Sequence, residues 1–129
     1  MAINIRETTG FYQTIPVLPT TNLVSGQLFL YGTTKILCVA EKTYYLTDVL
    51  GNANTEGVTA AIECVVEIPQ TTGQAALVLG AQVPFNFTTQ LIDSTVANSV
   101  IGTVIGYNTI NNNYTVKLFS YLNGVPTVA

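Results

Sequence analysis

The clearest structural signal in the chain lies in residues 57–68, which read Gly57-Val58-Thr59-Ala60-Ala61-Ile62-Glu63-Cys64-Val65-Val66-Glu67-Ile68. Apolar side chains recur at every second position from Val58 to Ile68, and both glutamates fall on the opposite face. A period of two is the repeat of a β-strand. One apolar and one mixed face is typical of an antiparallel sheet. We therefore expect one half-buried strand along this whole stretch.

Shorter patterns of the same kind predict further strands over residues 27–31, 35–41, 42–50, 83–88, 100–107 and 114–121. Pro84 cannot donate to a ladder, which predicts an edge or a bulge there. The run Asn111-Asn112-Asn113 predicts a hairpin turn between the last two strands. Residues 72–79 are a weak candidate for one helical turn. Strands spaced by about ten residues are typical of sandwiches and small barrels. The predicted fold class is all-β, a single antiparallel β-sandwich or small β-barrel with an extended N-terminal arm.

The first 22 residues differ in character from residues 23–129, which we expect to form the β-domain. Two prolines forbid a helix and favour extended chain. The segment is either an ordinary first strand or an arm that lies on a neighbouring subunit. The arm alternative predicts that a chain lacking residues 2–19 folds but no longer associates. Its candidate partner contacts are Phe11, Tyr12, Ile15, Pro16, Val17, Leu18 and Pro19.

Charged residues make up only 9% of the 129-residue chain, against roughly 25% in typical soluble proteins. The four basic residues are scattered and the net charge is −3, which argues against nucleic-acid partners and anionic membranes. No apolar run approaches the ~18 residues of a membrane helix. Because charges keep freely diffusing proteins apart, a surface this poor in them favours assembly into a larger object. A secreted Thr- and Asn-rich β-domain is the alternative.

The residues that most enzymes and metal sites need are scarce. The chain has no histidine, and it contains no phosphate loop, nucleophile elbow or EF-hand loop. We expect no enzymatic activity, no cofactor and no metal. Cys38 and Cys64 lie in apolar strand patterns, which predicts two buried, reduced thiols. The N-terminus lacks a basic region followed by an apolar stretch, so we expect synthesis in the cytoplasm without a secretory signal.

The order of the short motifs resembles that of the small head decoration proteins of tailed phages, also called cement or auxiliary capsid proteins. A Ser-Gly step precedes an apolar strand, and a Gly-Val-Ala-like strand follows with cysteine in place of glycine. The resemblance then runs through a strand ending in Pro, a Gly-x-x-Val plus aromatic strand, an Ile-Gly strand and a closing Val-x-Leu strand. These motifs are Ser25-Gly26-Gln27-Leu28-Phe29-Leu30, Cys38-Val39-Ala40, Val65-Val66-Glu67-Ile68-Pro69, Gly80-Ala81-Gln82-Val83-Pro84-Phe85, Ile101-Gly102-Thr103-Val104 and Val116-Lys117-Leu118.

This resemblance implies a β-protein of the virion that binds the outside of a phage head. There it would bridge neighbouring major capsid proteins and stabilise the shell, as a homo-oligomer, either a dimer or a trimer. A rival interpretation is a surface fibre or adhesin-like module that binds carbohydrate through Tyr44, Tyr45, Tyr107 or Tyr114. A third is a pilus-type subunit that donates its N-terminal strand to a neighbour.

Overall fold

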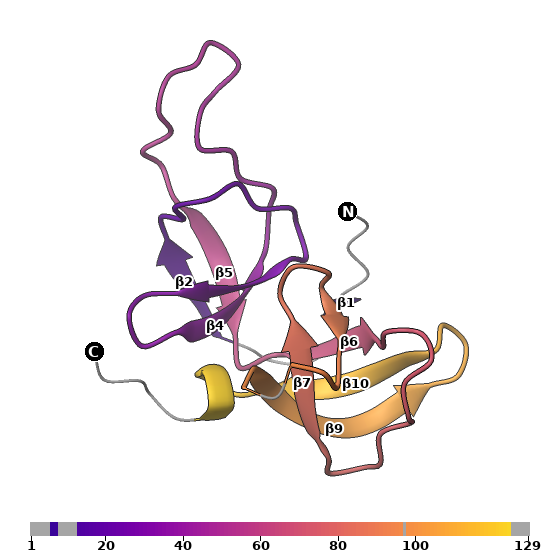
Figure 1. Ribbon diagram of the computed structural model, residues 1–129. Helices are drawn as coiled ribbons and strands as arrows, with labels where there is room; N and C mark the ends of the chain where they lie inside the picture. The colour runs from indigo at the N-terminus through magenta and orange to yellow at the C-terminus, as the bar shows by residue number, and fades with distance from the viewer. Residues whose placement is uncertain (1–5, 8–12, 97, 125–129) are drawn as a thin grey trace.

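The computed structural model describes residues 6–7, 13–96 and 98–124 and is built from β-strands (Figure 1). No α-helix occurs among these residues, and one 3₁₀ turn, η1 (Leu122–Gly124), follows the last strand. The strands are β1 (Arg6–Glu7), β2 (Gln13–Val17), β3 (Leu28–Tyr31), β4 (Ile36–Ala40), β5 (Val58–Ile62), β6 (Val65–Pro69), β7 (Gln82–Asn86), β8 (Leu91–Ile92), β9 (Val100–Asn108) and β10 (Asn113–Leu118).

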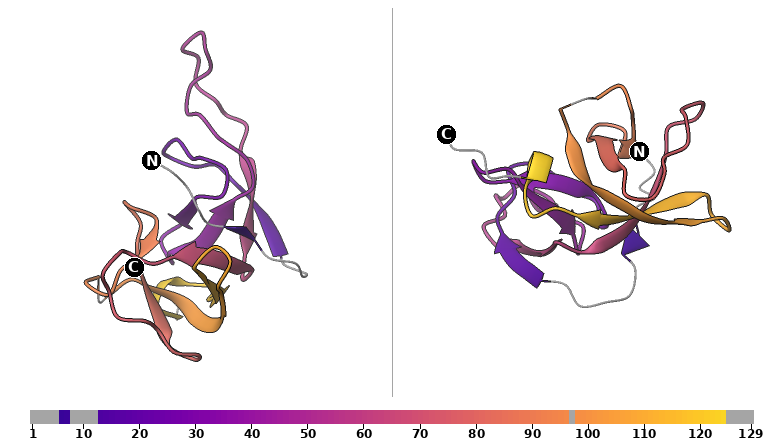
Figure 2. Two further views of the ribbon diagram at one scale, coloured as in Figure 1. Left: turned by 90° about the vertical axis from the view of Figure 1, so that its right-hand side faces the viewer. Right: turned by 90° about the horizontal axis from the view of Figure 1, so that it is seen from below.

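The strands form two antiparallel sheets, which confirms the all-β prediction. The larger sheet has six strands in the order β1-β6-β10-β9-β7-β8, and it curls into a half-barrel (Figures 1 and 2). The smaller sheet has four strands in the order β2-β5-β4-β3. The chain passes from the smaller sheet to the larger one between β5 and β6.

That passage corrects the prediction of one continuous strand over residues 57–68. Glu63 adopts a positive φ of 53°, a left-handed conformation that β-strands do not contain. The pattern therefore divides into β5, which pairs with β2 and β4, and β6, which pairs with β1 and β10. Glu63 itself is exposed, and its carboxylate accepts a hydrogen bond from the Ser120 hydroxyl.

The smaller sheet is covered on both faces, which explains why its strands are rich in small and apolar residues. One face packs on the larger sheet through Leu28, Leu37, Val39 and Ala61. The opposite face carries a second core, in which strand residues are covered from the loops by Leu23 and Tyr44. The members of this second core are Val17, Leu23, Phe29, Cys38, Ala40, Tyr44 and Ala60.

Two further local predictions are confirmed. β9 and β10 form a hairpin whose turn includes Asn112 at a positive φ of 59°, a conformation that asparagine tolerates. The register between β7 and β9 shifts at Pro84, as expected for a proline at a bulge.

Two other local predictions are wrong. Residues 42–50 form no strand; apart from isolated bridges they belong to a long projecting loop. Residues 72–79 form an irregular loop with turns near its two ends and no helix. Because neither segment buries a regular apolar face, its pattern receives no support from tertiary packing.

Both cysteine side chains are buried, as predicted, but they lie in different cores. Cys38 belongs to the core between the smaller sheet and its covering loops, and Cys64 to the core between the sheets. Burial raises the pKa of Cys38 to about 12, because an apolar environment disfavours the thiolate.

Asp93, which follows β8, forms hydrogen bonds with the loop before β7 and with the end of β7. Its carboxylate accepts hydrogen bonds from the Thr95 hydroxyl at 2.7 Å, Gln74 Nε2 at 2.8 Å and Asn86 Nδ2 at 3.3 Å. These bonds favour the charged form, with Thr95 contributing most, so the pKa of Asp93 lies below its usual value.

A lowered pKa adds stability above the unfolded-state pKa of about 4 that is lost as the pH falls toward the folded-state value. We expect the wild-type melting temperature to fall more between pH 5 and pH 2 than that of Asp93→Asn, which cannot titrate. Calorimetric melting at each pH measures this difference. Equal slopes for the two proteins would show that the Asp93 network does not couple to folding.

Candidate functional site

The predicted partner-contact residues that the structure describes lie in an edge strand and in the loop that follows it. Ile15, Pro16 and Val17 lie in β2, at the edge of the smaller sheet, where they pair with β5. Val17 is buried and Pro16 is exposed. Leu18 is exposed, whereas Pro19 is buried. Phe11 and Tyr12 lie outside the described residues. The part of the predicted arm that is described, Gln13–Val17, is a strand of the protein's own smaller sheet.

The most prominent surface feature is a finger, residues 42–57, that projects from the smaller sheet (Figures 1 and 2). Its base is anchored by Tyr44, which is buried, forms a β-bridge with Leu23 and donates a hydrogen bond from its hydroxyl to the Asn54 carbonyl at 3.2 Å. Further out, the two sides of the finger meet at the Thr47–Ala53 bridge. The finger therefore has a defined conformation along its length.

A carboxylate organises the end of the finger. Asp48 Oδ1 accepts hydrogen bonds from the backbone N–H groups of Leu50 and Asn52, both at 2.9 Å. The Asp48 carbonyl accepts another from Gly51, whose φ of +85° suits glycine. The hydrogen bonds to the carboxylate, with that from the Asn52 backbone contributing most, lower the pKa of Asp48. The Asp48 carboxylate is thus hydrogen-bonded to the backbone of its own turn.

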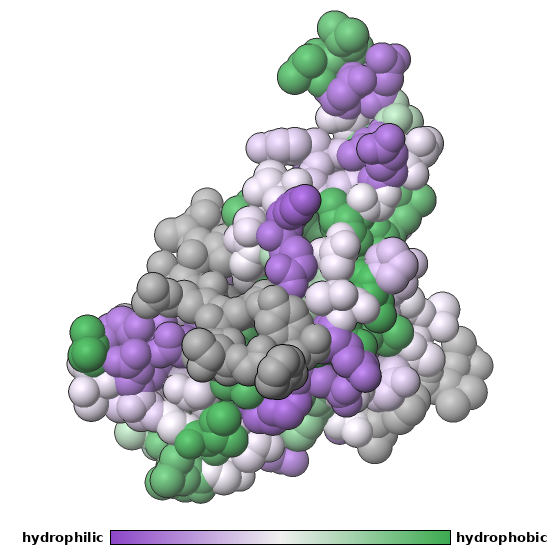
Figure 3. Space-filling model, turned by 180° about the vertical axis from the view of Figure 1, so that it is seen from behind, coloured by the Kyte–Doolittle hydropathy of each residue, from purple (hydrophilic) through white to green (hydrophobic). Residues whose placement is uncertain are grey.

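The same turn presents two apolar side chains to solvent. Val49 is fully exposed and Leu50 is 82% exposed, and the space-filling view shows hydrophobic surface at the end of the finger (Figure 3). Single exposed apolar residues are common on protein surfaces. Here, however, two adjacent ones stand at the end of a projection whose turn is fixed by hydrogen bonds. That arrangement is suited to insertion into a partner.

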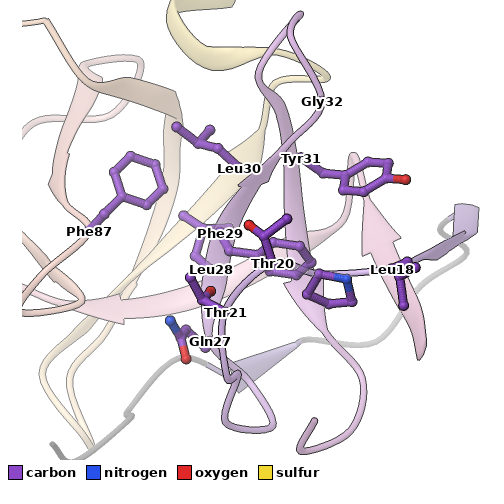
Figure 4. A pocket seen from close by; sticks show the side chains of 11 residues that line it. Leu18, Thr20, Thr21, Gln27, Leu28, Phe29, Leu30, Tyr31, Gly32 and Phe87 are labelled. Atoms are coloured by element: carbon purple, nitrogen blue, oxygen red, sulfur yellow. The ribbon is translucent and has the colours of Figure 1, made fainter. Parts of the chain in front are cut away.

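A second feature is a groove of about 510 Å³ beside β3, which we call the β3 groove (Figure 4). Three segments that are distant in sequence form it: the loop after β2, strand β3 with its flanks, and Phe87 beyond β7. None of its residues is charged. The lining comprises Leu18, Pro19, Thr20, Thr21, Gln27, Leu28, Phe29, Leu30, Tyr31, Gly32 and Phe87. Two predicted contact residues, Leu18 and Pro19, therefore do reach a candidate site.

The four tyrosines of the carbohydrate interpretation do not form one platform. Tyr44 and Tyr114 are buried, and the Tyr114 hydroxyl accepts a hydrogen bond from the Leu77 N–H at 2.9 Å. Tyr45 is exposed on the finger, and Tyr107 is exposed on β9 with its ring centroid 4.9 Å from that of Tyr114. Tyr44 and Tyr45 both line a groove of about 680 Å³ at the side of the finger, but of these two only Tyr45 is exposed.

The sequence prediction missed the finger tip and the β3 groove. The run Gly51-Asn52-Ala53-Asn54 is rich in turn-forming residues, and two large apolar residues immediately before such a run are a usable indication of an exposed contact. No comparable signal exists for the groove, because its walls meet only in the folded protein.

Among the described residues, no group of three or more histidine, cysteine, aspartate or glutamate side chains could hold a metal ion. Nor does any helix in the described part of the chain have the length and apolarity to cross a membrane. Comparison of the chain with protein-family models, with curated proteins and with solved structures finds no match.

Proposed function

We propose that this chain is a non-enzymatic structural protein that decorates the outer surface of a phage head. In this role it binds major capsid proteins, bridges neighbouring copies and stabilises the shell. The observation that supports the proposal best is the finger, with Val49 and Leu50 exposed at a hydrogen-bonded tip. The protein would be made in the host cytoplasm and reside on the capsid exterior as a homo-oligomer.

The energetics of the tip suit such a contact. Burying a large aliphatic side chain contributes about 1.5–3 kcal/mol, so two adjacent ones give a useful share of a weak interface. The turn is held by Asp48 before any partner arrives, which limits the entropy lost on binding. Repetition of a modest contact over a lattice then adds avidity.

The low charge of the chain agrees with this interpretation. Only 9% of residues are charged, so neighbouring copies at high local density would meet little electrostatic repulsion. The resemblance in motif order to head decoration proteins points to the same role.

The proposal is tested by co-sedimentation with empty, undecorated phage shells. In the double variant Val49→Ser, Leu50→Ser, we expect the apparent affinity for shells to fall at least tenfold, because two apolar contacts are lost. The fold should be unaffected, since both side chains are exposed. Occupancy is measured by quantitative gel analysis of pelleted shells over a range of protein concentrations.

The chain contains a matched control. Val78 and Leu79 are also an adjacent exposed Val-Leu pair, 72% and 73% exposed, in the loop before β7. Val78→Ser, Leu79→Ser should bind shells as the wild type does. Equal binding by the finger variant would show that the contact lies elsewhere. Failure of the wild-type protein to pellet with any shell would contradict the decoration function itself.

A fibre- or adhesin-like carbohydrate-binding function is the second candidate, supported by the exposed ring of Tyr45 beside Glu56 in the finger-side groove. Its weakness is that Asp48 and Asn54, two further polar residues of the groove, already form hydrogen bonds within the finger. Binding of wild-type protein to a glycan array, abolished by Tyr45→Ala, would favour this function over decoration.

A further inference from the structure

Strand β3 has one edge whose backbone groups are directed away from its own sheet. Leu28 donates its N–H to Gln90 Oε1 at 2.8 Å and accepts from Gln90 Nε2 at 2.9 Å, so its backbone faces away from β4. Backbone direction alternates along a strand, and Leu30 therefore faces the same way. Its partner in register, Leu37, donates to Ser120 on the other side of β4. No described residue bonds the Leu30 N–H or C=O.

The Gln90 side chain already occupies part of the free edge of β3, at Leu28. Its buried carboxamide donates to and accepts from Leu28 as one residue of a paired strand would, and it also donates to the Phe87 carbonyl at 3.0 Å. The Gln90 side chain thus forms the backbone hydrogen bonds of Leu28 but of no further residue along this edge. Two residues further along, the edge is open at Leu30, which is exposed.

Two of the other edges are blunted in ways that proteins commonly use. The edge strand β8 of the larger sheet contains only two residues, and of β1 at the opposite edge the structure describes Arg6 and Glu7. The remaining edge, β2, carries Pro16 opposite Thr59. The Thr59 carbonyl accepts a hydrogen bond from the Glu41 N–H at 3.4 Å, so the backbone of Thr59 faces away from β2. The Pro16–Thr59 pair therefore has no backbone hydrogen bond, and the N–H that proline lacks would have faced the free edge. Thr14, two residues before Pro16, also directs its backbone to that edge, so β3 is distinguished by having a free donor and a free acceptor beside an uncharged groove.

Leu30 is itself one of the residues that line the β3 groove, whose side chains stand on both sides of the strand. In Figure 4, Leu30 and Phe87 lie on one side of β3, and Tyr31 and Leu18 on the other. An added strand would place alternate side chains against these two walls. Because the lining is uncharged, charged side chains at those positions would lose hydration without gaining a partner.

We propose that the β3 groove binds an extended, uncharged segment of a partner protein by strand addition at Leu30. One residue of that segment would exchange two backbone hydrogen bonds with Leu30. Its neighbours, with apolar side chains, would pack on the Phe87 wall and on the Leu18–Tyr31 wall. Backbone bonds supply affinity and the side-chain walls supply selectivity in this mode of recognition.

The groove is poorly suited to a second copy of this chain. Symmetric β3–β3 pairing centred on Leu30 would set Leu28 opposite Gly32 of the other copy, where the Gln90 carboxamide already lies. The described strands are all engaged in their own sheets, and the finger tip is a turn. No described segment of a second copy is thus free to fill the groove, and the occupant we infer is a segment of a different protein.

Selection of random seven-residue peptides displayed on a carrier, using the full-length protein as bait, tests the proposal without any shell. We expect enriched peptides to be uncharged, with apolar residues at alternate positions, and to shift the Leu30 amide resonance in ¹⁵N spectra. N-methylation of the peptide residue that donates to Leu30 should weaken binding at least about fivefold, because it removes one hydrogen bond and adds bulk.

Protein variants provide the matched comparison. Leu18→Asp, in the groove and 50% exposed, should abolish peptide binding, whereas Val24→Asp, 49% exposed and outside the groove lining, should leave it unchanged. The proposal is overturned if no peptide is enriched, or if enriched peptides tolerate N-methylation and leave the Leu30 amide unshifted. Concentration-dependent protection of that amide in the protein alone would overturn it in favour of self-association. Success here with failure on shells would refute decoration only.

Discussion

A chain that lacks residues 2–19 is expected not to fold. The deletion removes β1, which pairs with β6, and β2, which pairs with β5 over five residues. It also removes Val17, which is 3% exposed, and Pro19, both of which are buried. The structure therefore favours the first-strand alternative over the arm alternative, under which the truncated chain would fold.

The size of this effect follows from what the deletion uncovers. Loss of Val17 alone removes about 1.5–3 kcal/mol of apolar burial. Loss of β2 also leaves the β5 edge unpaired and opens the core that contains Phe29 and Ala60. Natural proteins have only about 5–15 kcal/mol of stability in total. Circular dichroism and urea unfolding of the truncated chain measure the result.

Two neighbouring substitutions separate a folding role of this segment from a binding role. Val17→Asp places a charge in the core and should unfold the protein or lower its urea midpoint strongly. Leu18→Asp changes a side chain that is 50% exposed and should leave the midpoint within experimental error. A truncated chain with a native-like spectrum and cooperative unfolding would restore the arm alternative.

The hydrophobic pattern predicted the strands on each side of Glu63 but not their separation into two sheets. Val58, Ala60 and Ile62 do share one face, and Cys64, Val66 and Ile68 share another. A single left-handed residue redirects the chain without disturbing the period of two. Because glutamate has no special preference for that conformation, the hydropathy pattern contained no sign of the break.

The candidate sites were predictable only in part. Leu18 and Pro19 were singled out for their apolar character beside proline, and both line the β3 groove. The free backbone of Leu30 depends on the direction of a ladder and on the position of Gln90, 60 residues later in the numbering. Such a property belongs to the pairing of strands, which local sequence does not specify.

Replacement of Gly102 by alanine is expected to destabilise the protein by about 3 kcal/mol or more, near or above the upper end of ordinary overpacking. Gly102 is buried in β9, between Val83 of β7 and Leu118 of β10. An added Cβ would lie 2.3 Å from the Lys117 carbonyl oxygen and 2.9 Å from Val116 Cγ1. The first of these contacts is with backbone, so it cannot be relieved by a side-chain rotation.

Relief of that contact requires β9 and β10 to move apart, and these two strands form the longest hairpin of the larger sheet. Such a movement would weaken the backbone hydrogen bonds on both sides of β9. We therefore expect the melting temperature to fall by roughly 10 °C or more. Gly106 in the same strand is the matched control. A Cβ there would meet only the Thr115 side chain, at 3.6 Å, and should change stability by less than about 1 kcal/mol. Equal melting temperatures for Gly102→Ala and Gly106→Ala would show that the strands are not as closely apposed at Gly102 as the structure has them, whereas a large loss at Gly102 alone would identify this glycine as the residue that permits close pairing of β9 with β10.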